Sequence, residues 1–248
     1  MKIIINADDL GLSAAVNDAI FALMEEGRIT SATLMANAPA AEEAARRLGE
    51  LPGCSFGVHL VSTELRPLSS HPGLAPVLNE RGEFAGNLRR IKITPAIADG
   101  IFTEWCAQID RALALGVPIS HIDSHHHSHT EPRLFPVVKR IQKKYGIRKV
   151  RQSRTLYDCG KEPPAQLRVA KRIWNFALRH YVPTTTTKGF TSFETFHRLA
   201  AAGYHLPDTL ELMCHPGGEL FAHETALLRT SWKQELAPEA QLISYNLL

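Results

Sequence analysis

Short runs of apolar residues alternate along this chain with segments that have helical periodicity. The first run, residues 2–6, is continuous enough for a strand buried on both faces, and a helix with Ser13 as its N-cap is expected to follow over about 13–26. Alternation of strands and helices predicts a parallel sheet covered by helices. With 248 residues, the chain has the length of one (β/α) barrel. We therefore predict an α/β fold with a single barrel domain over residues 1–248.

Later elements are predicted from the same two patterns. Strands are expected where apolar or β-branched runs end in turn residues, and helices where apolar positions recur every three to four residues. The predicted strands cover residues 29–37, 54–60, 119–124, 149–154, 184–187, 209–217 and 242–245. The predicted helices cover residues 41–48, 95–115, 132–145, 166–179, 193–202 and 223–236.

Acidic and histidine residues stand where several of these strands end. The carboxyl ends of parallel strands meet at one edge of the sheet, and in barrels this edge carries the active site. We therefore expect the side chains to surround one pocket. The residues are Asp8 and Asp9 after the first strand, His59 near the end of the third, His125 and His127 after the fourth, and His215 after the last.

The densest cluster is the tract 125–129, in which four of five residues are histidine. Histidine is the commonest neutral nitrogen ligand of divalent metals. His125 and His127 are two positions apart, so in extended backbone both side chains would point to one face. Simpler interpretations stay open: the tract can be an exposed polar loop, His59 a hydrogen-bonded core residue, and the two aspartates mere charges at the N-terminus of the following helix.

Charge and cysteine content argue against several functions. The 28 Lys and Arg residues against 25 Asp and Glu residues give a formal net charge of +3, too small and too dispersed for a nucleic-acid groove. The four cysteines stand far apart without a Cys-x-x-Cys pair, which argues for reduced thiols rather than a zinc knuckle or disulfides. The sequence shows neither a signal peptide nor an apolar run of membrane-spanning length. We therefore predict a cytoplasmic protein without a membrane span.

Residues 61–94 form a long connection with several prolines and glycines and little helical pattern. Long loops in compact domains usually have a function, and this one directly follows His59, so we predict a lid or wall over the pocket. Arg151 and Arg154 on the predicted strand 149–154 would emerge near the pocket edge. There a guanidinium can support the ligands from behind or orient a polar or anionic substrate, although a surface position at a strand end is equally compatible.

The residue types at the predicted pocket suit hydrolysis. One carboxylate and two imidazoles can hold a divalent metal and leave coordination positions for water. Such a site lowers the pKa of bound water from about 15.7 to about 7. A second carboxylate beside the first can accept the proton of the water, and a histidine on the opposite side can protonate a departing amine.

Three segments resemble the YdjC family of carbohydrate deacetylases, which includes chitooligosaccharide deacetylases and hopanoid-associated homologues. They are residues 6–13 (NADDLGLS), 57–60 (GVHL) and 121–129 (HIDSHHHSH), and the resemblance extends over most of the chain. It implies a (β/α) barrel of the glycoside hydrolase/deacetylase type, one divalent metal ion, and removal of the acetyl group from an N-acetylated sugar, oligosaccharide or glycolipid. Carried over residue by residue, it matches Asp9, His59 and His125 to the metal ligands, Asp8 to the catalytic base, His215 to the acid, and His127 to a histidine behind the ligands.

Several alternatives stay open. Zinc or magnesium is expected first, and manganese, cobalt or nickel would also suit the predicted ligands. The resemblance leaves open a free oligosaccharide, a nucleotide sugar or a glycolipid as substrate, and a monomer or a homodimer. Other candidate functions are a metal-dependent amidohydrolase or phosphoesterase, a glycosidase that uses Asp8 and Asp9 as its acid and base, and a metal- or sugar-binding module without catalysis.

Overall fold

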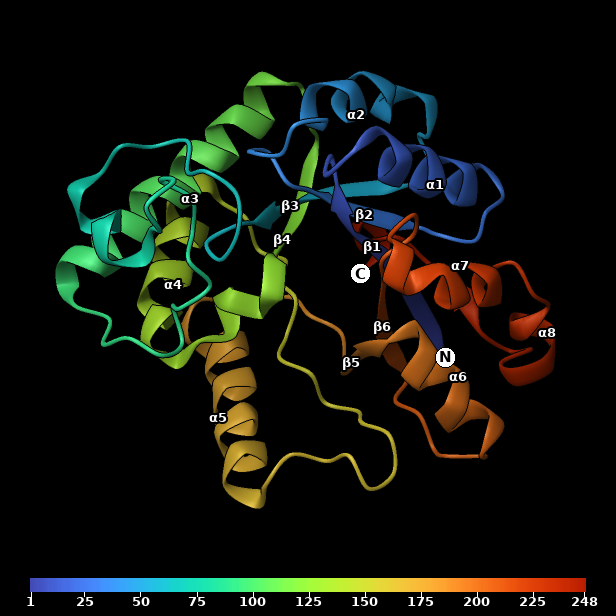
Figure 1. Cartoon of the computed structure of the whole chain (residues 1–248). Coiled ribbons are helices and arrows are strands. Elements are labelled where there is room, and N and C mark those ends of the chain that lie inside the picture. The colour runs from blue at the N-terminus through green and yellow to red at the C-terminus, as the bar shows by residue number, and fades with distance from the viewer.

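A computed structural model describes residues 1–248 and shows one α/β domain around a parallel sheet (Figure 1). The strands follow the order β4-β3-β2-β1-β6-β5, and β7 pairs with the start of β1. The strands are β1 Lys2–Leu10, β2 Ser31–Leu34, β3 Ser55–Leu60, β4 Ile119–Ser124, β5 Gly189–Ser192, β6 Thr209–Cys214 and β7 Gln241–Leu242. The helices are α1 Ala14–Glu25, α2 Ala41–Arg47, α3 Pro95–Ala114, α4 Phe135–Tyr145, α5 Ala165–Tyr181, α6 Phe193–Ala201, α7 Ala222–Leu228 and α8 Trp232–Leu236.

The predicted first β-α unit is confirmed. Residues Ile3, Ile4 and Ile5 of β1 are fully buried, because the strand lies in the middle of the sheet with neighbours on both sides. The Ser13 side chain accepts a hydrogen bond from the Val16 amide and so caps α1. This unit positions the end of β1, where the two adjacent aspartates stand.

The predicted single α/β domain with a parallel sheet is confirmed, but the barrel is not closed: the sheet curls into a half-barrel, and its edge strands β4 and β5 do not pair with each other. Predicted strand 149–154 is irregular coil: Val150 makes one parallel bridge to Ile122 of β4, while the Thr155 amide donates to the Phe190 carbonyl of β5. The coil that follows α4 thus runs between the two edge strands (Figure 1). Its polar residues do not alternate with apolar ones, and they turn towards buried partners instead of forming a ladder.

Two further predicted elements differ from the structure. The Thr-rich segment 184–187 contributes a single bridge, Lys149 to Thr185, and the regular strand β5 begins only at Gly189. The predicted helix 223–236 is two helices, α7 and α8, separated by residues 229–231. None of the helices combines the length and the hydropathy that crossing a bilayer requires.

Residues 61–94 are an ordered connection without a long helix. They contain a short 3₁₀ segment, Pro72–Val77, and one antiparallel bridge between Leu78 and Phe84. Leu74, Val77, Phe84 and Leu88 are buried in the main core, which fixes the connection against the domain. Arg133 donates hydrogen bonds to the carbonyls of Ile91 (2.5 Å) and Leu88 (3.4 Å) near the end of this segment.

Candidate metal centre

The end of β1 turns the two adjacent aspartates in different directions. Asp9 has a φ of 64°, in the left-handed region that aspartate tolerates better than most residues, and the register with β2 shifts between Ala7 and Leu10. The Asp8 side chain therefore points into the domain, while Asp9 faces β3 and the turn after β4. A strand with regular alternation would also have separated them, but the bulge sets the actual direction of Asp9.

Asp9, His59 and His125 come together at the carboxyl edge of the sheet. Asp9 Oδ1 lies 3.2 Å from His59 Nε2 and 2.9 Å from His125 Nδ1. One ligand atom from each residue lies within 4.8 Å of the other two, as a single ion requires. Burial opposes ionisation of Asp9, but the hydrogen bonds from His125 and His59 outweigh it and hold the pKa of Asp9 below its usual range.

Asp123, which the sequence analysis did not select, orients His59. The two residues are register partners on β4 and β3, and Asp123 Oδ1 lies 2.7 Å from His59 Nδ1. Burial lowers the pKa of His59, but Asp123 raises it by more, to about 10. With a proton on Nδ1 shared with Asp123, Nε2 faces Asp9, which is the arrangement of a histidine ligand held by a carboxylate behind it. The sequence did contain one indication of this role, because Asp123 is a carboxylate within a strand that was predicted to be buried.

We expect Asp123→Asn to weaken metal binding without removing a ligand. An amide cannot supply the negative charge that polarises His59, and loss of such partners costs about 10–100-fold in metal affinity or activity. Isothermal titration of the metal-free protein with zinc would measure the change. Ser120→Ala is a matched control on the same strand, because its hydroxyl binds the Phe56 carbonyl, away from His59. Equal affinity of Asp123→Asn and the unaltered protein would contradict this role.

Asp8 is buried and is bound by both terminal nitrogens of Arg151, each at 2.7 Å. The same guanidinium contacts Asp123 Oδ2 and Glu211 Oε1, also at 2.7 Å. Arg151 has no exposed surface and so does not emerge at the pocket edge; it lies behind Asp8, where three carboxylates from three strands hold it inside the half-barrel. Arg151 therefore fixes the Asp8 carboxylate from the interior of the domain and cannot reach a substrate.

Glu211 on β6 is a buried carboxyl group whose shifted pKa makes the stability of the fold depend on pH. Burial raises its pKa to about 7 against the opposing effect of Arg151, and Tyr245 donates a hydrogen bond to it. Between pH 4.5 and about 7 the unfolded chain is therefore ionised at this residue while the folded protein keeps the proton. Unfolding releases that proton, so stability falls as pH rises through this window.

Glu211→Gln should remove that contribution. The amide oxygen still accepts from Arg151, and the amide nitrogen donates to the Tyr245 hydroxyl, so the fold is retained. Chemical unfolding at pH 4.5 and pH 7.5 should show that the free energy of unfolding of the variant loses about 2–3 kcal/mol of pH dependence. Glu239→Gln, at an exposed position, is the matched control. An unchanged pH dependence in Glu211→Gln would exclude this residue as the source.

His215 follows β6 and lines the same cavity as Asp9. Its ring stacks on Phe221 at 4.4 Å between centroids, and its amide donates to Glu224 Oε2 at 2.8 Å. Burial lowers the pKa of His215, but Glu224, Asp8 and Asp9 raise it by more, so the ring holds a proton more readily than a free histidine. Glu224 on α7 was missed, because nothing in the sequence links it to His215.

The histidine tract does not continue β4 in extended form. Residues His125–Thr130 form a 3₁₀ turn in which His126 and His127 have φ angles of 52° and 54°. The argument that His125 and His127 share one face is therefore wrong, because the strand ends at Ser124. His127 is nevertheless directed inward: its ring packs edge-on against Phe190 at 5.6 Å, and burial and the charge of Arg151 hold its pKa well below the usual value. The interpretation as an exposed loop fits only His126, which is exposed.

A cavity of about 700 Å³ opens above these residues. The connection 61–94 contributes Thr63, Leu88 and Arg89 to its wall. Glu64 lies beside it, with Oε2 at 3.2 Å from His125 Nε2. Arg154 does not line this cavity and donates to Thr195 at 2.7 Å; it lines a neighbouring cavity that shares Arg89 and His127 with this one.

The donor set fits a divalent metal ion. One carboxylate and two imidazoles match the three-ligand sites that leave positions for water or substrate. His59 and Asp9 are fixed by partners other than the ion, which reduces the ordering needed on binding. The fold and this donor set define the chain as a parallel α/β half-barrel with a candidate divalent-metal site at the carboxyl edge of its sheet.

The chain belongs to the YdjC family: the profile of the YdjC-like proteins matches residues 2–238. A carbohydrate deacetylase of Geobacillus stearothermophilus is 45% identical over 153 residues, which cover 61% of this chain and 60% of the relative. A second one, from Halalkalibacterium halodurans, is 32% identical over 87% of this chain and 85% of its own length. The match to the first of these relatives thus spans less than two thirds of its length. The predicted resemblance to this family is confirmed.

A solved structure supports the fold alone. A crystal structure from Enterococcus faecalis, of a candidate cellobiose-phosphate cleavage protein, has a TM-score of 0.75 and 22% identity, and it covers 99% of this chain and 98% of its own.

Proposed function

We propose that the protein is a metal-dependent carbohydrate N-deacetylase, which hydrolyses the amide of an N-acetylated sugar. The observation that carries this proposal is the set Asp9, His59 and His125, whose ligand atoms lie within 4.8 Å of one another in a cavity of about 700 Å³. Asp8 and His215 line the same cavity and are not among the three proposed ligands. The relatives named carbohydrate deacetylases support the same substrate class.

In this proposal Asp9, His59 and His125 hold one divalent ion, with Glu64 close enough to His125 to adjust its orientation. When bound, the ion supplies Lewis-acid chemistry that polarises the acetyl carbonyl and makes water acidic. Two imidazoles and a carboxylate suit zinc, and the open positions also admit magnesium, manganese, cobalt or nickel.

Asp8 is proposed as the general base. Arg151 holds both of its oxygens, which fixes the carboxylate and keeps it from rotating to the metal ligands. His215 is proposed as the general acid, because its raised pKa lets the ring keep the proton that the departing sugar amine needs. His127 is proposed to support the ligands from below through its packing on Phe190.

The substrate class stays as broad as a free oligosaccharide, a nucleotide sugar or a glycolipid. We keep the cytoplasm as the proposed location, which the four free cysteines support. The oligomeric state is left between a monomer and a homodimer.

The connection 61–94 is proposed to act as a wall that selects substrate length. It lines the cavity through Thr63, Leu88 and Arg89 but supplies none of the three proposed ligands. Replacing residues 79–83 at its tip by a two-residue turn should change the preference among mono-, di- and trisaccharides and leave the metal content unchanged. An identical substrate profile before and after shortening would count against this role.

The proposal is tested by acetate release from N-acetylated sugars and chitooligosaccharides, with zinc, magnesium, manganese or cobalt added to metal-free protein. We expect release that depends on the metal and stops with a chelator. Hydrolysis of a model phosphodiester to its monoester and alcohol instead would indicate a phosphoesterase. Glycosidic cleavage that resists the chelator would indicate a glycosidase, and binding without turnover would indicate a module without catalysis.

A further inference from the structure

Helix α5 exposes apolar side chains on the face opposite its buried one. Trp174 and Leu178 are buried in the core, yet Val169, Ile173 and Phe176 are 53%, 64% and 65% exposed. These three positions are spaced i, i+4 and i+7, so they form one stripe along the outer surface of the helix. A helix that needed only one packing face would carry polar residues there.

The polar residues that flank this stripe are all cationic or neutral. The 17 residues of α5 contain Arg168, Lys171, Arg172 and Arg179 but no aspartate or glutamate. At 100° per residue, Arg168 and Arg172 lie beside the stripe, between it and the part of the helix that faces Arg154. Lys171 donates to the Tyr157 hydroxyl rather than to a carboxylate.

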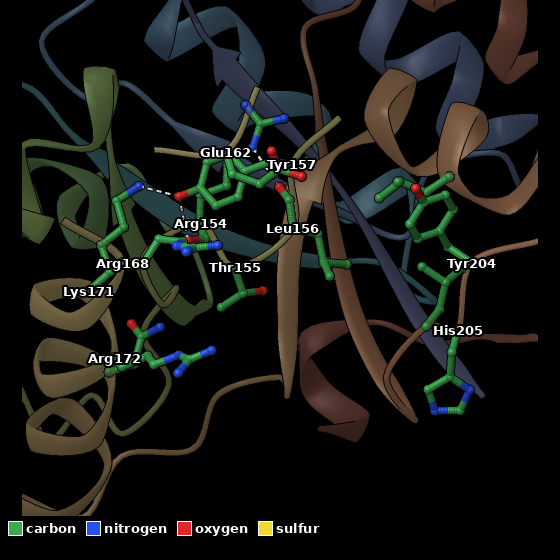
Figure 2. A pocket seen from close by; sticks show the side chains of 13 residues that line it. Arg154, Thr155, Leu156, Tyr157, Glu162, Arg168, Lys171, Arg172, Tyr204 and His205 are labelled. Carbon is green, nitrogen blue, oxygen red and sulfur yellow. Dashed lines mark hydrogen bonds between the residues drawn. The ribbon is translucent and has the colours of Figure 1, made fainter. Parts of the chain in front are cut away.

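A separate cavity of about 410 Å³ adjoins α5 and concentrates these cations (Figure 2). Arg154, Arg168, Lys171 and Arg172 line it, and Glu162 is its only carboxylate. Figure 2 shows Lys171 reaching from α5 to the Tyr157 hydroxyl, beside Arg154. Burial lowers the pKa of Lys171, and the charge of Arg154 lowers it further, so the cavity has an excess of positive charge that a bound anion would relieve.

We propose that α5 and this cavity form a docking surface for a membrane rich in anionic phospholipid. The stripe of Val169, Ile173 and Phe176 would enter the boundary between headgroups and acyl chains. Arg168 and Arg172 would contact headgroup phosphates, with the cavity receiving one of them. One partner then accounts for both the exposed apolar stripe and the surplus of cations.

Charge argues for this occupant over a second copy of the chain. A two-fold contact through α5 would bring its cations against those of its partner, and the helix offers no acidic residue to neutralise them. A small phosphate-bearing ligand would satisfy the cavity but would leave the stripe in water. An anionic lipid surface satisfies the two features together.

The test is flotation of the full chain with vesicles of phosphatidylcholine alone, or of phosphatidylcholine and phosphatidylglycerol in a two-to-one mixture, at low and at physiological salt. We expect binding to the anionic vesicles only, weakening as salt rises. The double variant Arg168→Gln with Arg172→Gln should bind about 25-fold more weakly, since each cation near an anionic surface contributes about fivefold. Ile173→Gln with Phe176→Gln should reduce binding at least about tenfold.

Matched controls replace exposed residues of the same types elsewhere. Arg46→Gln with Lys143→Gln removes two cations from α2 and α4, and Leu113→Gln removes an exposed leucine from α3. None of the residues substituted in the α5 variants or in the controls lines the cavity around Asp9, so activity on a water-soluble substrate should be equal in all variants. That readout keeps a failure of docking distinguishable from a failure of the proposed deacetylase function.

Three results would overturn the proposal. The first is absence of binding to phosphatidylglycerol vesicles, and the second is binding that the α5 variants and the control variants reduce equally. The third is a dimer of the unaltered chain in analytical ultracentrifugation that Ile173→Gln with Phe176→Gln dissociates, because the stripe would then be covered by a second copy.

Discussion

Asp9→Ala should yield a folded protein that retains no metal ion through dialysis and releases no measurable acetate. Asp9 contacts both proposed histidine ligands, so its loss removes one of three ligands and the carboxylate charge between two imidazoles. Removal of a hydrogen-bond partner of a metal ligand lowers metal affinity about 10–100-fold, and loss of a ligand itself is expected to lower it more. Elemental analysis after dialysis, together with the acetate assay, measures both effects.

The control for this variant is Asp18→Ala, which removes an exposed aspartate of α1 that pairs with Arg47. It should keep full metal content and full activity, because surface ion pairs contribute little. His59→Ala and His125→Ala should resemble Asp9→Ala. Full metal occupancy in all three variants would show that the ion binds elsewhere.

Asp8→Asn is expected to keep the metal ion and lose about 10²–10⁴-fold in rate, the usual contribution of a general base. The metal stays because Asp8 faces Arg151 rather than His125. The domain stays folded because Arg151 keeps its contacts with Asp123 and Glu211. Metal content and kcat for acetate release should therefore respond differently to this substitution.

Asp9→Asn provides the matched comparison, because it makes the same chemical change at the neighbouring position. It should lower the metal content, whereas Asp8→Asn should not. The opposite outcome, in which Asp8→Asn strips the ion and Asp9→Asn retains it, would exchange the two assignments at the end of β1.

The parts of the site that could be predicted are those encoded by local pattern. A buried apolar run predicts where β1 ends, and its end predicts where Asp8 and Asp9 stand. The parallel arrangement then brings His59, His125 and His215 to the same edge, which needs no knowledge of side-chain contacts. These residues all line one cavity in the structure.

The interior partners could not be predicted, because each depends on a contact between distant strands. Asp123 meets His59 only through the register of β3 and β4, and Arg151 meets Glu211 across 60 residues. The turn at His126 and His127 was also missed: four clustered histidines predict metal binding but carry no information about a left-handed backbone. The open side of the half-barrel was not predicted for a similar reason. The sequence of residues 149–154 resembles an edge strand, and only the contacts of its side chains show that it is coil.

The irregular coil between β4 and β5 changes what holds the half-barrel at a fixed width. In a closed barrel, the hydrogen-bond ladder sets the circumference. Here Arg151, which that coil carries, ties β1, β4 and β6 together through Asp8, Asp123 and Glu211. The spacing between the proposed base and strand β4, which leads to His125, is thus set by these ion pairs, and their strength varies with the protonation of Glu211. The width of the candidate site is in this way linked to an ionisable group that has no solvent-exposed surface.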